Sequence, residues 1–228
     1  FHEEDASLRT IVKGVNGARP AGVLAVGDRP TVVAARAAEA LGLRGNPPDA
    51  ACASRNKLAC RLALQRAGLR VPWFRAVPLD RDIAALAAEA PYPCVVKPLA
   101  LSGSRGVIRA NDRAEFAAAF RRVAALLHEP DVRIERDAAH DAIMIESFIP
   151  GREYAVEAVM TNGRLEVLAI FDKPDPLDGP FFEETIYVTP PAASPDDQVR
   201  IESAVTDAAR AIGLYHGPVH AECRLDGS

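Results

Sequence analysis

The sequence predicts an α+β fold that follows part of a parallel α/β unit. The α/β part is predicted because the apolar run 21–27 is typical of a strand, ends at a glycine and leads into a helix opened by Pro30. The α+β part is predicted because two further strands, 153–160 and 164–171, are joined by Asn162-Gly163. That dipeptide is typical of a type I′ turn between antiparallel strands, where both central residues need a positive φ.

The composition is that of an ordinary globular protein and argues against several functional classes. The chain has 228 residues, 49% of them hydrophobic and 25% charged, which is enough for one large domain or two small ones. Its net charge of -4 comes without a basic stripe, so nucleic acid is not an expected partner, and no apolar run approaches the roughly 20 residues of a membrane span. The four cysteines form no C-x-x-C pair, which argues against a zinc site, and free thiols suit the cytoplasm. The polar N-terminus does not begin with Met, as expected for a chain that starts inside a longer protein.

Helices and short strands alternate in the first half of the chain. Asp28 is expected to cap the first helix, Ser54 the second, and Asn111 or Asp112 the fourth, because short polar side chains accept hydrogen bonds from free N–H groups. The predicted elements are helices over 31–43, 55–68, 81–90 and 113–127, an extended segment from Val71, a strand over 92–98 and another from Val107.

Strands prevail in the second half. The polar stretch 129–141 is expected to be a surface loop, and the proline-rich segment 172–195 to hold a short strand near 181–188. A long helix opens at Pro195 and ends at Gly213. The other predicted strands cover 142–148, 153–160, 164–171 and 217–227.

Lys97 is the most informative residue, because it lies in the apolar strand 92–98 and a buried ammonium needs a partner. The Gly/Ser loop 102–106 follows it directly. A lysine beside a glycine loop can hold a polyphosphate, since the ammonium supplies a point charge and the bare backbone can close over the oxygens. The loop lacks the Walker sequence, so two alternatives stay open: a mobile hairpin tip, and an edge-strand lysine that deters aggregation.

Three other charged residues are candidates for the same site. Lys57 opposes the dipole of its helix in the first turn, so either an anion compensates it or it is solvated. Glu146 ends the apolar face of the strand 142–148, and Glu153 opens the next strand. A carboxylate there can line a ligand pocket and accept hydrogen bonds from two ribose hydroxyls, or it can be a solvated acid at a strand end.

The last strand alternates, so that Val219, Ala221, Cys223 and Leu225 point one way and His220, Glu222, Arg224 and Asp226 the other. Glu222 suits Mg²⁺, which uses one or two carboxylates together with phosphate oxygens. The alternative is an exposed polar face on which Glu222 pairs with Arg224. His220 is expected to be a hydrogen-bonded neighbour rather than a metal ligand.

Taken in order, these motifs resemble the ATP-grasp superfamily over about residues 20–228. The elements are N-K on a helix, V-V-K-P, a Gly/Ser loop, E-S-F-I-P-G-R-E-Y, and H-A-E. F-F-E-E-T followed by G-P-V-H-A-E is most similar to the carboxylate–amine ligases, including the branch that forms dipeptides from L-amino acids. The resemblance implies two α+β subdomains that clamp ATP, preceded by a remnant of a Rossmann-like domain. The implied parts are a partial α/β domain over 1–50, a helical linker over 51–91, a lid over 92–148 and an incomplete C-terminal subdomain over 149–228.

The resemblance also implies which residues hold the nucleotide. Lys57 and Lys97 would contact the phosphates, and the loop would fold over them with Ser102, Gly103, Ser104, Arg105 and Gly106. On the hinge strand, Glu146 would lie in the site, the backbone of Ser147, Phe148 and Ile149 would pair with the adenine edge, and Glu153 would hold the ribose.

Three further residues would serve the reaction. Glu222 would be the first Mg²⁺ ligand, and Arg105 is a candidate catalytic cation. Glu184 is similar to an acid with which some dipeptide-forming members meet a substrate ammonium. The family supplies a second metal carboxylate and a phosphate arginine in an E-I-N-x-R type strand, and this sequence ends at Ser228 before any such strand.

The implied activity is an ATP-dependent ligation of a small-molecule carboxylate to an amine or thiol through an acylphosphate. Two alternatives stay open: a non-catalytic nucleotide-binding module of the same fold, and a member that uses bicarbonate as the acid. The sequence does not identify the acid or the amine. Arg152 and Lys173 could face a substrate carboxylate or solvent. Many superfamily members are dimers, so a homodimer is allowed.

Overall fold

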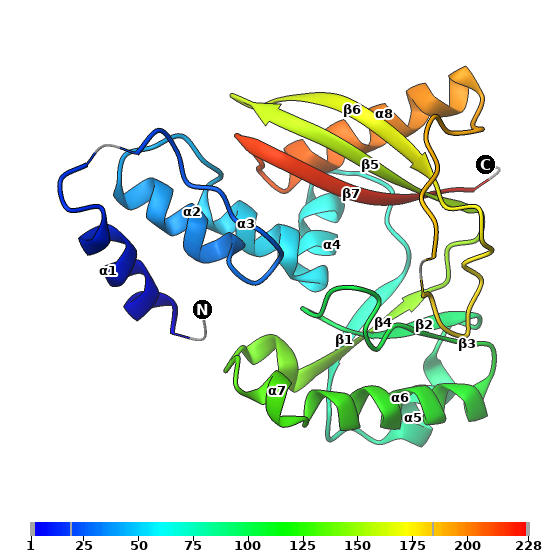
Figure 1. The fold of residues 1–228 in the computed structure, drawn as a ribbon. Coiled ribbons are helices and arrows are strands. Elements are labelled where there is room, and N and C mark those ends of the chain that lie inside the picture. Colours follow the sequence, from blue (N-terminus) through cyan, green and yellow to red (C-terminus); the bar gives the residue numbers. More distant parts are fainter. Residues whose placement is uncertain (1–2, 19, 184, 227–228) are drawn as a thin grey trace.

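Two antiparallel sheets face each other in the computed structural model, which describes residues 3–18, 20–183 and 185–226 (Figure 1). The four-stranded sheet has the order β1-β4-β2-β3, and the three-stranded sheet has the order β6-β5-β7. The strands are β1 (Phe74–Pro78), β2 (Cys94–Pro98), β3 (Ile108–Ala110), β4 (Ala142–Ser147), β5 (Arg152–Thr161), β6 (Arg164–Asp172) and β7 (Gly217–Leu225). The mixture of helices with antiparallel sheets confirms the predicted α+β class.

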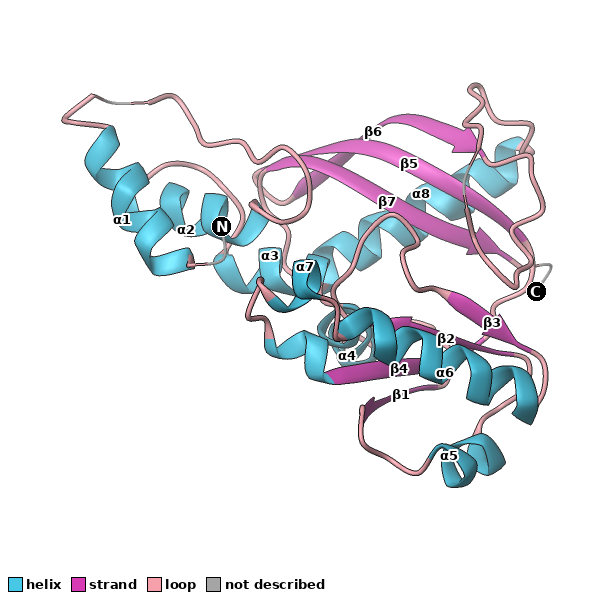
Figure 2. Ribbon diagram, turned by 60° about the horizontal axis from the view of Figure 1, so that its bottom comes forward, coloured by secondary structure: helices cyan, strands magenta, loops and turns pink. Residues whose placement is uncertain are grey.

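Helices cover the outer faces of the two sheets and form the N-terminal part (Figure 2). They are α1 (Glu4–Gly14), α2 (Thr31–Ala40), α3 (Pro48–Arg55), α4 (Lys57–Arg66), α5 (Ile83–Glu89), α6 (Arg113–Leu127), α7 (Pro130–Arg133) and α8 (Pro195–Ala211), with a 3₁₀ turn η1 (Ala138–Asp141). None of the helices in the described part of the chain is long and apolar enough to cross a membrane.

The four-stranded sheet, which we call the lid sheet, buries one face against α5 and α6. Phe116 and Phe120 of α6 pack with Cys94 and Val96 of β2, all fully buried. Because side chains alternate along a strand, Val95 and Lys97 must point to the opposite face. That opposite face is the one turned toward the second sheet (Figure 1).

The three-stranded sheet is built in the same way. Tyr154 and Val156 of β5 pack against Ile201 and Val205 of α8, together with Cys223 of β7. The alternation predicted for 217–227 is therefore confirmed, and the polar residues of β7 lie on the face toward the lid sheet. The hairpin between β5 and β6 turns at Asn162 and Gly163, whose φ values of 52° and 80° confirm the predicted turn chemistry.

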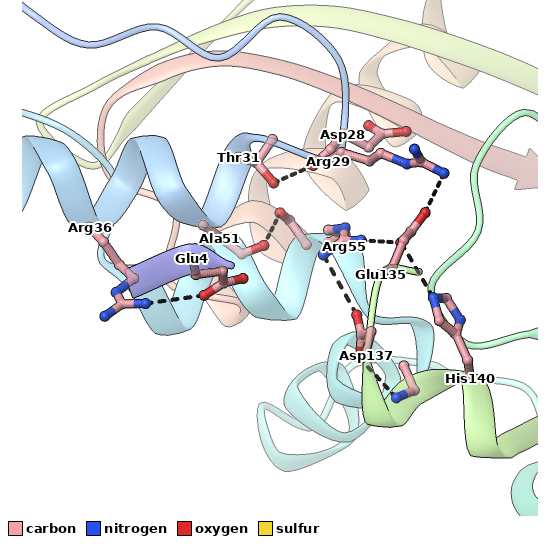
Figure 3. A network of polar contacts seen from close by, with 12 residues as sticks. Glu4, Asp28, Arg29, Thr31, Arg36, Ala51, Arg55, Glu135, Asp137 and His140 are labelled. Carbon is pink, nitrogen blue, oxygen red and sulfur yellow. Dashed lines mark hydrogen bonds and ion pairs between the residues drawn. The ribbon is translucent and has the colours of Figure 1, made fainter. Parts of the chain in front are cut away.

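A buried carboxylate, Glu135, ties the N-terminal helices to the segment after α6 (Figure 3). Its side chain is 6% exposed and forms ion pairs with Arg29, which precedes α2, and with Arg55 at the end of α3. His140 of η1 lies 3.3 Å from the same carboxylate and is fully buried. These contacts of Glu135 fix how the helices before α4 sit against the part of the chain that carries the lid sheet.

The prediction of a strand over 21–27 is wrong. The run is irregular, and Leu24 and Val26 are 68% and 87% exposed. A strand is stable only when its N–H and C=O groups pair with a neighbour, and the described residues offer this run none. The helix that follows is confirmed as α2, but Asp28 does not cap it through its side chain. The described residues before β1 form helices without a sheet, so the predicted Rossmann-like remnant is not shown.

Other corrections concern local boundaries. Asn56, not Ser54, caps the helix that carries Lys57, because Pro48 starts a separate helix that ends at Arg55. The stretch 129–141 holds α7 and η1, since Val132 is apolar and fully buried. The segment 181–188 makes isolated bridges at Phe181 and Val188 instead of a strand. The predicted helices α6 and α8 are confirmed, and Asp112 is the cap of α6.

Candidate functional site

Lys97 lies on β2 with its ammonium against the Glu146 carboxylate of the neighbouring strand. Val95 is directly opposite Glu146 in the sheet register, so Lys97 reaches that carboxylate diagonally and forms an ion pair with it. Both side chains are largely withdrawn from solvent, at 13% and 5% exposure. Burial lowers the pKa of Lys97, and the Glu146 carboxylate acts in the opposite direction. The strand thus presents a partly neutralised cation on the inner face of the lid sheet.

Lys57 is held at the start of α4, next to Lys97. The Asn56 side chain caps the helix by accepting from the N–H groups of Leu58 and Ala59. The Lys57 ammonium donates to the Leu101 carbonyl at 2.6 Å, at the entrance of the glycine loop. Burial, followed by repulsion from Lys97, lowers the pKa of Lys57 to about 8. The two lysines are therefore close enough to disfavour each other's charge, which an anionic ligand would relieve.

Arg61 is a third cation in this cluster that the sequence interpretation missed. It lies one turn after Lys57 on α4, and its Nε donates to Glu146 Oε1 at 2.5 Å. The signal that could have found it was the i, i+4 spacing from Lys57, which puts both side chains on one helix face. Glu146 therefore lies between Lys97 and Arg61, where its carboxylate balances part of their charge.

The glycine loop after β2 has the backbone freedom that its sequence suggests. Gly103, Ser104 and Gly106 have φ values of 61°, 52° and 77°. A Cβ on Gly106 would lie 2.7 Å from Leu126 Cδ2 and 3.0 Å from Pro98 Cγ, so this position accepts only glycine without a shift. Residues 101–106 can therefore bend back over the end of β2.

Arg105 does not point toward the lysines. Its Nη1 lies 2.8 Å from Asp131 Oδ2 and its Nη2 lies 3.7 Å from Glu129 Oε2, both at α7. Bonding to Asp131 raises the pKa of Arg105, which remains charged. The structure therefore places this candidate catalytic residue apart from the Lys57–Lys97 cluster. In the loop, residues 102–104 separate it from Leu101, whose carbonyl accepts from Lys57.

Among the residues predicted to pair with the adenine edge, one backbone N–H is left for a ligand. The N–H of Ser147 donates to the Trp73 carbonyl and that of Phe148 to the Pro93 carbonyl, each at 2.9 Å. No described residue accepts from the N–H of Ile149, whose carbonyl accepts from Arg224 at 3.1 Å. Of the three predicted adenine contacts, the Ile149 N–H is thus the available donor.

The second sheet contributes a row of alternating charges that faces the lid. Glu153 Oε1 accepts from Lys173 at 2.9 Å, and Glu153 Oε2 accepts from Arg224 at 2.9 Å. Lys173 also donates to Glu222 Oε1 at 2.5 Å. Lys173 is only 3% exposed, so it faces two carboxylates of its own chain rather than solvent. Both oxygens of Glu153, the predicted ribose ligand, are already engaged.

His220 is hydrogen-bonded, as expected, and its partner is Glu157. Its Nδ1 lies 2.7 Å from Glu157 Oε1, and its Nε2 lies 3.8 Å from Glu222 Oε1, too far for a hydrogen bond. The carboxylates of Glu222 and Glu157 raise the pKa of His220 to about 9. The imidazolium therefore adds positive charge beside Glu222.

The basic cluster on the lid and the charged row on the second sheet are within electrostatic reach of each other. The Glu222 carboxylate, on β7, is among the groups that raise the pKa of Lys57 on α4. At the hinge end the gap between the sheets is filled by Leu177 and Phe182, which pack on Val95. Glu184, the acidic residue predicted to meet a substrate ammonium, lies outside the described residues.

Glu222 fits a metal that arrives with a nucleotide better than a metal held by protein alone. The described residues contain no group of three or more His, Cys, Asp or Glu side chains that could hold an ion. Mg²⁺, however, is commonly bound by one or two carboxylates plus phosphate oxygens. Glu222 is 44% exposed at the side chain and carries the required hard oxygen, although Lys173 contacts it.

Known proteins resemble this chain in sequence and fold. Alanine–anticapsin ligase of Bacillus subtilis is 30% identical over 205 residues, which cover 84% of this chain and 42% of that ligase. Carnosine synthase 1 of Gallus gallus is 29% identical over 238 residues, which cover 98% of this chain and 25% of the synthase. The crystal structure of an L-amino acid ligase from Bacillus licheniformis superposes with a TM-score of 0.82 at 33% identity and covers 99% of this chain and 52% of the ligase.

This chain thus spans about half of these relatives' length or less. The protein family described as the ATP-grasp domain matches residues 90–228, which is more than half of the chain. The match includes β2, the glycine loop, the hinge and β7, and it confirms the resemblance that the motifs indicated. The chain belongs to the ATP-grasp domain family.

Proposed function

We propose that the protein is an ATP-dependent ligase that joins a small-molecule carboxylate to an amine through an acylphosphate. A carboxylate oxygen would attack the γ-phosphorus and release ADP. The amine would then attack the acyl carbon, lose a proton and displace phosphate. Three of its relatives are named as an alanine–anticapsin ligase, a carnosine synthase and an L-amino acid ligase, which favours amino acids as substrates.

The chain's own residues would bind and orient the reactants. Lys57 and Lys97 would neutralise phosphate oxygens as the transferred group gains charge. Loop 102–106 would close over them and exclude water, which protects an acylphosphate from hydrolysis. The Ile149 N–H would donate to the adenine edge. Glu222 would hold Mg²⁺, which would offset the negative charge of the phosphates.

The observation that carries this proposal is the pair of buried ammonium groups of Lys57 and Lys97 beside the glycine loop. Burial is costly for a cation, and it lowers the pKa of both residues. Such a cost is sustained at ligand sites, where an anion repays it on binding. Glu222, whose carboxylate on the second sheet acts electrostatically on Lys57, would supply a metal carboxylate on the opposite wall.

The test is a phosphate-release screen of the whole protein against pairs of amino acids, with the Lys97→Ala variant beside the wild type. We expect ADP and phosphate to form only with a productive pair, and Lys97→Ala to abolish both. Unchanged turnover in that variant would overturn the assignment. Calorimetric binding of ATP without ADP from any pair would support a non-catalytic module instead, and turnover that depends on bicarbonate would support a carboxylating member.

A further inference from the structure

We propose that Arg61 is a third phosphate-binding cation, which contacts the nucleotide's polyphosphate through the outer edge of its guanidinium. The proposal rests on the proposed function and extends the site beyond Lys57 and Lys97. Nothing in the motifs that identify the family singles out this residue. Its position relative to Lys57, Lys97 and Glu146 carries the inference.

Arg61 and Lys57 lie on one face of α4, four residues apart. Like charges at this spacing destabilise a helix, so the arrangement calls for an anion nearby. Leu58 of the same helix packs against the cluster that contains Met144 of β4, which holds α4 to the inner face of the lid sheet. Both cations are therefore fixed beside Lys97.

The guanidinium of Arg61 is only half engaged. Its Nε donates to Glu146 Oε1 at 2.5 Å, while neither Nη1 nor Nη2 has an acceptor among the described residues. The side chain is 24% exposed, and its two Nη atoms are not among the buried polar atoms that lack a hydrogen-bond partner. Two N–H-bearing nitrogens in a rigid plane therefore remain free to donate, and this geometry suits phosphate oxygens.

The charges of the cluster support the same conclusion. Lys57, Lys97 and Arg61 contribute three positive charges, and Glu146 contributes one negative charge, which leaves a net charge of about +2 when all four are ionised. Arg61 is among the groups that lower the pKa of Lys97, so the cations repel one another across the Glu146 carboxylate. Glu146 contacts two of the three cations, and Asp28 and Glu222 offset part of the Lys57 charge. A polyphosphate would neutralise the positive charge that remains.

The experiment compares ATP, AMP and inorganic tripolyphosphate by calorimetric titration of wild type, Arg61→Met and Arg61→Lys. The control is Arg66→Met, because Arg66 is an exposed arginine at the end of the same helix. We expect Arg61→Met to weaken the binding of ATP and tripolyphosphate about tenfold, as the loss of a charged hydrogen bond does, and the binding of AMP less than about twofold. Arg61→Lys keeps the charge but not the forked guanidinium, so its affinities should lie between those of the wild type and Arg61→Met. Arg66→Met should match the wild type.

Two outcomes would overturn the inference. One is ATP affinity in Arg61→Met equal to that of the wild type. The other is an equal loss for ATP and AMP, which would mean that Arg61 only supports Glu146 and the local fold. If circular dichroism shows that Arg61→Met is unfolded, Arg61→Lys decides by the same ratio of ATP to AMP affinity. Failure of the wild type to bind ATP would instead refute the proposed function.

Discussion

The Lys173 ammonium donates to Glu153 Oε1 at 2.9 Å, although the two residues come from different segments of the second sheet. Glu153 is near the start of β5, and Lys173 directly follows β6. The same ammonium reaches Glu222 on β7, so one buried cation connects all three strands at the end of the sheet that faces the hinge. The candidate metal ligand therefore has its carboxylate oriented by a side chain of its own sheet.

Replacing Lys173 with Met should lower the free energy of unfolding by about 3 kcal/mol, because it leaves the Glu153 and Glu222 carboxylates without the cation between them. Urea denaturation followed by circular dichroism measures the change. The matched variant Lys173→Met/Glu222→Gln should recover part of the loss, since one of the two carboxylates that lose the Lys173 ammonium no longer carries a charge. No recovery in the double variant would show that packing of the lysine stem, not charge, is what matters.

Nucleotide affinity should decrease as the pH rises through about 8, because the pKa of Lys57 is lowered to about 8 and only its charged form attracts phosphate. Above that pKa the association constant should fall by about tenfold per pH unit, as expected when one proton is taken up on binding. Titration calorimetry with ATP between pH 6.5 and 9.5 tests this, with Lys57→Met as the control that should lose the slope.

The same pKa shift affects the fold with the opposite sign. The unfolded chain keeps the Lys57 proton up to its ordinary pKa of 10.5, whereas the folded chain releases it near 8. The unfolded state thus binds more protons between these values, and the contribution of Lys57 to the free energy of unfolding should rise with pH over that interval. A decrease that Lys57→Met removes would contradict the assignment.

Gly106→Ala should destabilise the protein by about 2–3 kcal/mol, because the new Cβ would collide with Leu126 and Pro98 and because φ is 77°. Gly103→Ala is the matched control: its φ is 61°, but a Cβ there meets nothing within 4 Å, so about 1 kcal/mol is expected. Thermal unfolding of both variants gives the comparison. Equal losses would show that the backbone conformation alone limits both positions.

Much of the fold could be predicted because its signals are local. The hairpin at Asn162-Gly163, the cap at Asp112 and the alternation of β7 each follow from a few adjacent residues. The strand over 21–27 failed for the converse reason, since an apolar run becomes a strand only beside a partner. The loop prediction for segment 129–141 failed because its polar sequence hides three buried residues, Val132, Ala139 and His140.

The site was predictable where a motif carries it and not where charges from distant segments meet. Lys57, Lys97 and Glu222 were candidates from their places in the sequence and from the family resemblance, and the structure brings them within electrostatic reach. That Glu146 would balance Lys97 and Arg61, and that Lys173 would be buried between two carboxylates, depends on contacts between residues 20 to 85 positions apart. No local pattern encodes such pairs.

Glu135→Ala should lower the free energy of unfolding by about 3 kcal/mol, because Arg55 and the fully buried His140 would lose the carboxylate that they share with Arg29 (Figure 3). The exposed Glu129→Ala is the control, and its pair with Arg105 at 3.7 Å should contribute less than about 1 kcal/mol. Hydrogen exchange would locate the loss: faster exchange is expected in α3 and in the segment from α7 to η1, which Glu135 connects, and not in β5–β7. Uniform acceleration across both sheets would mean that the contact stabilises the whole fold, whereas local acceleration would show that it joins the N-terminal helices to the lid.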